Sequence, residues 1–177
     1  MKMKFGFFLS LSYPDNDVLQ PIISDLQKRY CALPPFKPHL TIYHTTSLCS
    51  LPAAITATTR AVSQIKTFMI ESDGLDHSET WSKILFIRIK PNPVISAIRT
   101  NIGIELGEIE SSVYTPHISL MYKDELSSIE RGNIARNLRL PNHFRIQGIQ
   151  IVSPGKSNND WRDYAEWEVL HSITFPK

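Results

Sequence analysis

The sequence lacks three features that would place it in familiar classes of protein. It has no apolar stretch near the roughly 18 residues of a membrane-spanning helix. It has no glycine-rich phosphate loop of the GxGxxG or GxxxxGK[ST] kind. Its only cysteines, Cys31 and Cys49, stand 18 residues apart and belong to no cluster with metal-ligand spacing. These absences argue against a membrane-spanning protein, a loop-type nucleotide-binding protein and a zinc module.

The chain also has little net charge, only +2 for 19 basic and 17 acidic residues. A charge this small does not predict wrapping of a nucleic acid, so an anionic substrate must be met locally. The apolar start, residues 5–9, is short for a signal peptide and is better explained as a first strand. We interpret the two cysteines as buried thiols in a reducing compartment. We therefore expect a cytoplasmic monomer without membrane association.

One five-residue pattern occurs twice. Residues 38–42 read Pro-His-Leu-Thr-Ile, and residues 116–120 read Pro-His-Ile-Ser-Leu. Two copies are expected by chance on the order of once in 10⁴ chains of this composition. Side chains two residues apart in a strand share a face. Each motif therefore presents an imidazole beside a hydroxyl, His39 with Thr41 and His117 with Ser119.

Both halves of the chain follow one order of elements, which is strand, helix, motif strand, helix, strand. We expect strands over residues 4–12, 37–44, 67–72, 81–90, 115–122, 144–152 and 166–175, with a turn at residues 73–74. We expect helices over residues 21–31, 50–65, 92–106 and 125–138, with Ser50 as an N-cap.

This repeat predicts an α+β fold with mainly antiparallel sheets. We expect one domain, residues 1–177, built as two lobes of about 1–75 and 80–177 that are related by a pseudo-twofold axis and that exchange strands. Outer helices would cover the sheets around a central cleft. The two motif strands would meet across that cleft, although His39 and His117 are 78 residues apart.

Two imidazoles and two hydroxyls in one site suit a reaction on a phosphate ester. Opening a cyclic phosphodiester with water needs one proton removed from the nucleophile and another delivered to the departing sugar oxygen. Histidine, with a pKa of about 6.5, can do either near neutral pH. Thr41 and Ser119 would hold the non-bridging phosphate oxygens. The symmetric motifs leave open which of His39 and His117 is the base, and no metal or cofactor is required.

With these paired motifs about 80 residues apart, the sequence resembles the two-histidine (2H) phosphoesterase superfamily. The segment 116–122, in which a serine motif is followed by Tyr122, is most similar to the cyclic phosphodiesterase branch. The resemblance implies a bilobal fold, no metal, and hydrolysis of ADP-ribose 1″,2″-cyclic phosphate or of nucleoside 2′,3′-cyclic phosphates. It also implies that Tyr122 contacts the substrate.

Other candidate substrate contacts rest on weaker signals. Tyr122 has the opposite strand parity to His117, so it reaches the cleft only if the strand ends or bends before it. Trp81, next to turn residues, could stack on a base or pack in the core. Tyr43 shares parity with His39 and could line the cleft floor or pack. The basic residues near the motif and edge strands could meet a second phosphate; they are Lys37, Lys83 and Lys123.

Two other functions stay open at this point. The chain could act on RNA ends, by opening 2′,3′-cyclic phosphates or by 2′–5′ ligase-like chemistry, although the low net charge weighs against an extended RNA surface. It could instead be a non-catalytic nucleotide-binding module. Binding alone does not need two titrating groups, so the paired histidines favour the enzyme.

Overall fold

The structure, a computed structural model, describes residues 2–31, 34–108, 113–122, 126–155 and 161–177. Its strands are β1 (Lys2–Met3), β2 (Gly6–Leu11), β3 (His39–His44), β4 (Cys49–Ser50), β5 (Phe68–His77), β6 (Leu85–Ile89), β7 (His117–Met121), β8 (His143–Ser153) and β9 (Glu168–Thr174). Its α-helices are α1 (Tyr13–Leu26), α2 (Leu51–Ala61), α3 (Pro93–Leu106) and α4 (Ser128–Asn137). None of the helices in these ranges is long and apolar enough to cross a membrane.

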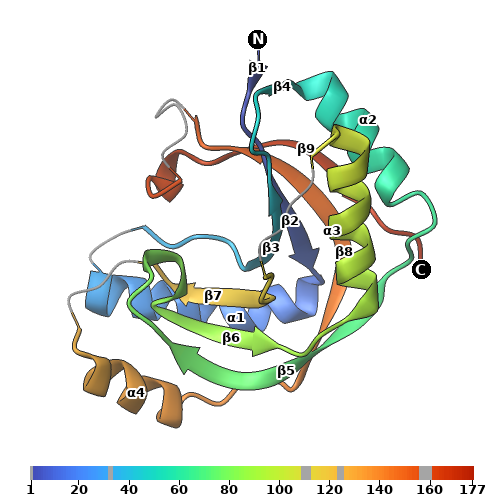
Figure 1. The fold of residues 1–177 in the computed structure, drawn as a ribbon. Helices are drawn as coiled ribbons and strands as arrows, with labels where there is room; N and C mark the ends of the chain where they lie inside the picture. Colours follow the sequence, from blue (N-terminus) through green and yellow to red (C-terminus); the bar gives the residue numbers. More distant parts are fainter. Residues whose placement is uncertain (1, 32–33, 109–112, 123–125, 156–160) are drawn as a thin grey trace.

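All strand pairs among the described residues are antiparallel, which confirms the predicted α+β class. The main sheet has the order β3-β2-β8-β5-β6-β7, and β9 also pairs with β8 (Figure 1). β8, from the second half of the chain, therefore lies between β2 and β5 of the first half. The two halves share one sheet through this exchange of strands.

The sheet bends at a bulge in β5. Residues 68–71 of β5 pair with β8, whereas residues 72–77 pair with β6, and the register shifts between Ser72 and Leu75. Gly74 lies in this bulge with φ of +90°, a conformation that glycine adopts at little cost. The predicted turn at residues 73–74 is therefore wrong, because the strand continues through the bulge to His77 instead of ending there.

The bend brings the two ends of the sheet together. β3 and β7, the motif strands, are the outermost strands in the sheet order, yet they contact one another. The hydroxyl of Tyr114, which precedes β7, donates a hydrogen bond of 2.8 Å to the backbone carbonyl of Thr41 on β3. In Figure 1 the two strands lie next to each other near the middle of the molecule. Sequence separation is thus no obstacle to a shared site.

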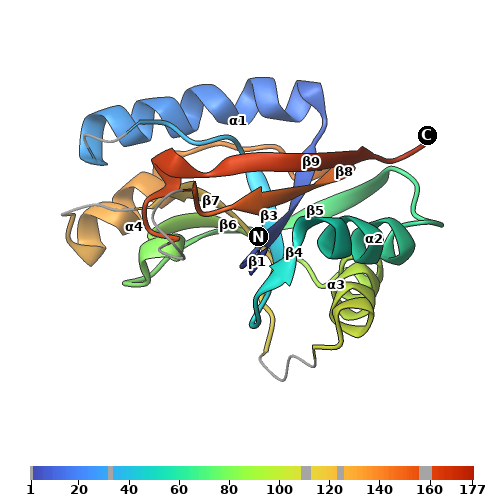
Figure 2. The same ribbon diagram turned by 90° about the horizontal axis from the view of Figure 1, so that it is seen from above.

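Helices cover the outside of the sheet. Figure 2 shows α1 on one side of the strands and the pair α2 and α3 on the other. α3 packs against β3, α1 against β7 and α4 against β5. The predicted cap Ser50 accepts a hydrogen bond of 3.4 Å from the Ala53 amide at the start of α2. Each motif strand is therefore backed by a helix.

The first helix begins earlier than expected. α1 starts at Tyr13, with Pro14 in its first turn, and Pro21 lies inside it. The prediction of a start at Pro21 is wrong because proline favours the first turn of a helix, and here Pro14 already occupies that turn. The chain then continues as a π-helical segment, Gln27–Cys31.

Candidate active site

The two motif histidines make the same orienting hydrogen bond. His39 Nδ1 lies 2.8 Å from the backbone carbonyl oxygen of Lys37, and His117 Nδ1 lies 3.0 Å from that of Thr115. A carbonyl oxygen only accepts, so each Nδ1 carries the proton and donates it. Each Nε2 is consequently a lone-pair acceptor when the ring is neutral. In both motifs the accepting carbonyl stands two residues before the histidine, with the motif proline between them.

A cavity of about 450 Å³ lies between the motif strands. Six of the seven predicted site residues line it, namely Thr41, Tyr43, Trp81, His117, Ser119 and Tyr122. The seventh, His39, lines a neighbouring cavity of about 320 Å³ instead, and Trp167 borders both cavities. The structure therefore gathers the predicted residues, but the two histidines line different, neighbouring cavities.

Tyr122 connects His39 to the larger cavity. Its hydroxyl lies 3.2 Å from His39 Nε2, and because that nitrogen carries no proton in the neutral ring, the tyrosine donates. A regular strand would turn Tyr122 away from the face of His117, but β7 ends at Met121, so this constraint does not apply to Tyr122. Leaving the strand lets Tyr122 turn toward the cavity that His117 and Ser119 line.

Aromatic rings surround His39, whose exposed fraction is only 7%. The ring of Phe8 stacks on it with the centroids 4.2 Å apart, and Trp167 contacts it edge-on at 5.7 Å. Burial lowers the pKa of His39 to about 4, against an upward effect of the hydrogen bond to Lys37. Burial likewise lowers the pKa of His117 to about 4. Both imidazoles are therefore neutral in the free protein at neutral pH.

The motif hydroxyls have different surroundings. The Ser119 hydroxyl donates a hydrogen bond of 2.6 Å to the backbone carbonyl of Ser82, so it must turn away from Ser82 to donate to a phosphate. Thr41 is half-buried and lines the cavity. The two hydroxyls thus lie on the same cavity as His117, whereas strand parity predicts Thr41 on the same face as His39, which lines the neighbouring cavity.

Trp81 and Tyr43 form part of the cavity wall. Trp81 lies in a short 3₁₀ turn, Trp81–Lys83, and not at the start of a strand as expected, and its ring centroid is 5.2 Å from that of Tyr122. The hydroxyl of Tyr43 donates a hydrogen bond of 2.9 Å to Glu108, which also accepts from the amides of Thr46 and Ser47. Tyr43 therefore lines the cavity, and its hydroxyl shares the Glu108 carboxylate with the loop after β3.

The cavity has a cationic lining. Lys83 and Arg99 contribute to it, and no carboxylate is among its described lining residues. Lys83 donates a hydrogen bond of 2.7 Å to the Thr115 hydroxyl, and the guanidinium carbon of Arg99 lies 4.7 Å from the centroid of the Tyr114 ring. Lys37 is exposed and borders the smaller cavity, and Lys123 lies outside the described residues. Such a lining suits an anionic ligand.

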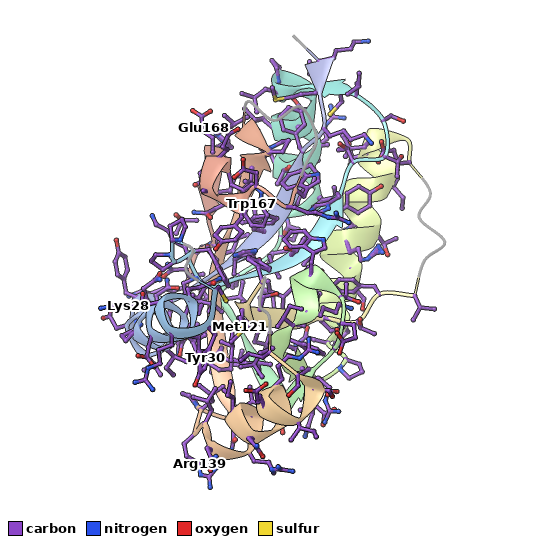
Figure 3. The ribbon with its side chains drawn as sticks, turned by 90° about the vertical axis from the view of Figure 1, so that its left-hand side faces the viewer. Lys28, Tyr30, Met121, Arg139, Trp167 and Glu168 are labelled. Atoms are coloured by element: carbon purple, nitrogen blue, oxygen red, sulfur yellow. The ribbon has the colours of Figure 1, made fainter. Side chains whose placement is uncertain are left out.

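Sequence reasoning missed the aromatic residues of the C-terminal segment. Trp161 stacks on His44 with the centroids 4.4 Å apart, and both line the larger cavity. Trp167 lies near the middle of the view in Figure 3. All three tryptophans of the chain, Trp81, Trp161 and Trp167, therefore border one cavity. The tryptophan positions follow no shared motif, so the small number of tryptophans was the only feature of the sequence that could have pointed to their place at the cavity.

Comparisons with known proteins agree with this fold. The family model described as the 2′-5′ RNA ligase superfamily matches residues 14–158. The chain belongs to this superfamily, that of the 2H phosphoesterases. No match to a curated protein sequence was found.

Solved structures show the same architecture. The protein TT0787 of Thermus thermophilus has a TM-score of 0.65 and 15% identity, with 98% of each chain covered. LigT of E. coli complexed with ATP has a TM-score of 0.59 and 11% identity, with 100% of each chain covered. LigT of E. coli complexed with 3′-AMP has a TM-score of 0.59 and 12% identity, again with 100% of each chain covered. At these identities the likeness establishes the fold.

Proposed function

We propose that the protein hydrolyses a cyclic phosphodiester in a small nucleotide to a phosphomonoester, without a metal, by acid–base catalysis through His39 and His117. The observation that carries this proposal is the matched pair of imidazoles. Both are held through Nδ1 by a backbone carbonyl, and both stand on strands that meet at the ends of one sheet. Positioned acid–base catalysis of this kind contributes roughly 10²- to 10⁴-fold to a rate.

The cavity supports a nucleotide as the substrate class. Its volume, about 450 Å³, is in the range of small-molecule sites. Tryptophan rings provide faces on which a base or ribose can stack, and Lys83 and Arg99 provide positive charge for phosphate. Our preferred substrates are ADP-ribose 1″,2″-cyclic phosphate and nucleoside 2′,3′-cyclic phosphates.

One histidine of the site must become protonated when the substrate binds. One imidazole must be protonated to deliver a proton to the departing sugar oxygen, yet burial keeps both pKa values near 4 in the free protein. A phosphate anion beside an imidazole favours the charged form and raises its pKa. Substrate binding therefore supplies the charge that lets one histidine take up the proton, while Thr41 and Ser119 bind the non-bridging oxygens.

An alternative is an enzyme that acts on RNA ends, as a 2′,3′-cyclic phosphodiesterase or with 2′–5′ ligase-like chemistry. The description of the matching family, the 2′-5′ RNA ligase superfamily, favours this alternative. The same histidines, hydroxyls and cations would serve it. An RNA substrate would differ from a small nucleotide only in the part that lies outside the cavity. The small net charge of +2 favours the small nucleotide over RNA.

Turnover assays test these proposals. The protein is incubated, with and without EDTA, with ADP-ribose 1″,2″-cyclic phosphate, 2′,3′-cyclic AMP and an oligonucleotide ending in a cyclic phosphate, and the products are identified. We expect hydrolysis of a small nucleotide that EDTA does not reduce. Rapid turnover of the oligonucleotide alone would support the RNA-end alternative, and nucleotide binding without any turnover would support a non-catalytic binding module.

Histidine variants test the assigned roles. We expect His39→Ala and His117→Ala each to lower kcat by roughly 10²- to 10⁴-fold. The matched control is His143→Ala, because His143 is exposed on β8 and lines neither cavity. A His39 or His117 variant with the turnover of the control would remove that residue from the mechanism.

A further inference from the structure

The two catalytic candidates differ in how they reach the substrate cavity. His117 lines the 450 Å³ cavity together with Thr41 and Ser119. His39 lines the smaller cavity and not the 450 Å³ cavity, and its Nε2 is occupied by the Tyr122 hydroxyl at 3.2 Å. Since Nδ1 of His39 is engaged by the Lys37 carbonyl, both ring nitrogens already have partners. A substrate in the larger cavity meets Tyr122 where it would otherwise meet His39.

Tyr122 is held firmly in this position. It is 3% exposed, and its ring packs against four aromatic rings, with centroid distances of 4.1 Å to Phe36, 5.2 Å to Trp81, 5.2 Å to Tyr164 and 5.7 Å to Trp167. Displacing the ring would break these contacts and leave a void in a close-packed interior. Keeping Tyr122 in place is therefore the arrangement that the packing favours when a ligand binds.

We propose that Tyr122 is a catalytic residue that relays a proton from the attacking water to His39. This inference rests on the proposed hydrolysis and deepens it, because it assigns His39 as the base and His117 as the acid. The assignment follows from the resting hydrogen bond, in which the phenolic proton of Tyr122 already points at the lone pair of a neutral His39. His39 is thus ready to accept a proton and not to donate one.

The attacking water gives a proton to the Tyr122 oxygen as the phenolic proton of Tyr122 moves to His39 Nε2. The water oxygen forms a bond to phosphorus, and the bond from phosphorus to the sugar oxygen breaks. The sugar oxygen takes the proton carried by the His117 imidazolium. The net reaction consumes one water, and afterwards His39 returns its proton to solvent while His117 takes one up.

The electrostatics of the site agree with a relay through a neutral phenol. Burial raises the pKa of Tyr122 well above its usual value, although its side-chain interaction with Ser119 acts in the opposite direction. Tyr122 therefore does not persist as a phenolate, and it passes a proton on only while it receives another. The contact with Ser119 also links the second motif to the base of the first.

The decisive variant is Tyr122→Phe, which removes the hydroxyl and keeps the ring. We expect it to lower kcat by roughly 10²- to 10⁴-fold, as much as His39→Ala does, and to change KM by less than about threefold. The double variant Tyr122→Phe/His39→Ala should be no slower than either single variant, because both interrupt one proton path. The control is Tyr30→Phe, since Tyr30 lines neither cavity, and its kcat should equal that of the wild type.

A second measurement uses the unmodified protein. Nitrogen NMR of the imidazoles reports whether His39 keeps its Nδ1 proton and its Nε2 hydrogen bond when inorganic phosphate is added. We expect both to persist at saturating phosphate. Loss of the Tyr122 contact on phosphate binding would show that the ligand replaces the tyrosine, and it would overturn the relay even if Tyr122→Phe failed to fold.

The kinetic outcomes separate the relay from the proposed function. If the wild type turns over no cyclic phosphate, the proposed function fails. If the wild type is active and Tyr122→Phe keeps its kcat, or raises KM alone, the relay fails while the proposed function stands. A double variant whose loss is the product of the two single losses would likewise show that Tyr122 and His39 act separately.

Discussion

Acidification of the free protein should destabilise it through its buried imidazoles, and His39 provides the sharpest case. Burial lowers the pKa of His39 to about 4, from 6.5 for an exposed histidine. The unfolded chain therefore binds a proton at this position at a higher pH than the folded chain does. Stability from the neutral, buried ring is present above pH 6.5 and is lost as the pH falls from 6.5 toward 4.

The size of the effect follows from the difference between the two pKa values. Each pKa unit is about 1.4 kcal/mol, so complete acidification through this window costs about 3 kcal/mol for His39 alone. His117, whose pKa burial also lowers to about 4, adds a second contribution of the same sign. Losses of this size are a large part of the roughly 5–15 kcal/mol that typically stabilises a domain.

Urea unfolding between pH 7 and pH 5 measures this contribution. In the middle of the window the wild type should lose about 1.4 kcal/mol of unfolding free energy per pH unit through His39. His39→Gln, which cannot titrate, should show a slope smaller by that amount. The comparison uses slopes, so the effect of the substitution on stability at pH 7 cancels.

If NMR titration of the wild type showed the His39 ring titrating near pH 6.5, burial would not control its protonation. Equal pH slopes for the wild type and His39→Gln would lead to the same conclusion. His143→Gln, at an exposed position on β8, provides the control.

Three further predictions concern the site and the loop beside it. At alkaline pH both kcat and kcat/KM should fall as His117 loses its proton, but kcat should fall at a higher pH because bound phosphate raises the pKa of His117. If both fell at the same pH, the prediction would be contradicted. Glu108→Gln should lower the unfolding free energy in urea by about 1–3 kcal/mol, because three donors lose a charged acceptor. Glu105→Gln, which removes only an exposed pair with Arg60, should change it little, and equal losses would refute the role of Glu108. Adding AMP should change tryptophan fluorescence, since all three tryptophans border the cavity, and an unchanged spectrum at saturation would place the ligand elsewhere.

Short-range patterns predicted much of the fold. Strand parity paired His117 with Ser119, which both line the larger cavity, and the cap at Ser50 was predicted correctly. Parity also paired His39 with Thr41, which line different cavities. These signals depend on residues a few positions apart. The start of α1 was wrong for the same reason, because Pro14 and Pro21 carry the same local signal and only one of them begins the helix.

The sequence alone determined the chemistry that the chain brings, namely two imidazoles and two hydroxyls on strands in matching places. Only the tertiary structure decided how those groups meet. The bulge at Gly74 turns the sheet so that its outermost strands touch, and the end of β7 lets Tyr122 reach His39. Sheet curvature and side-chain packing depend on partners far apart in the chain, so no local pattern could show that His39 lies behind a tyrosine.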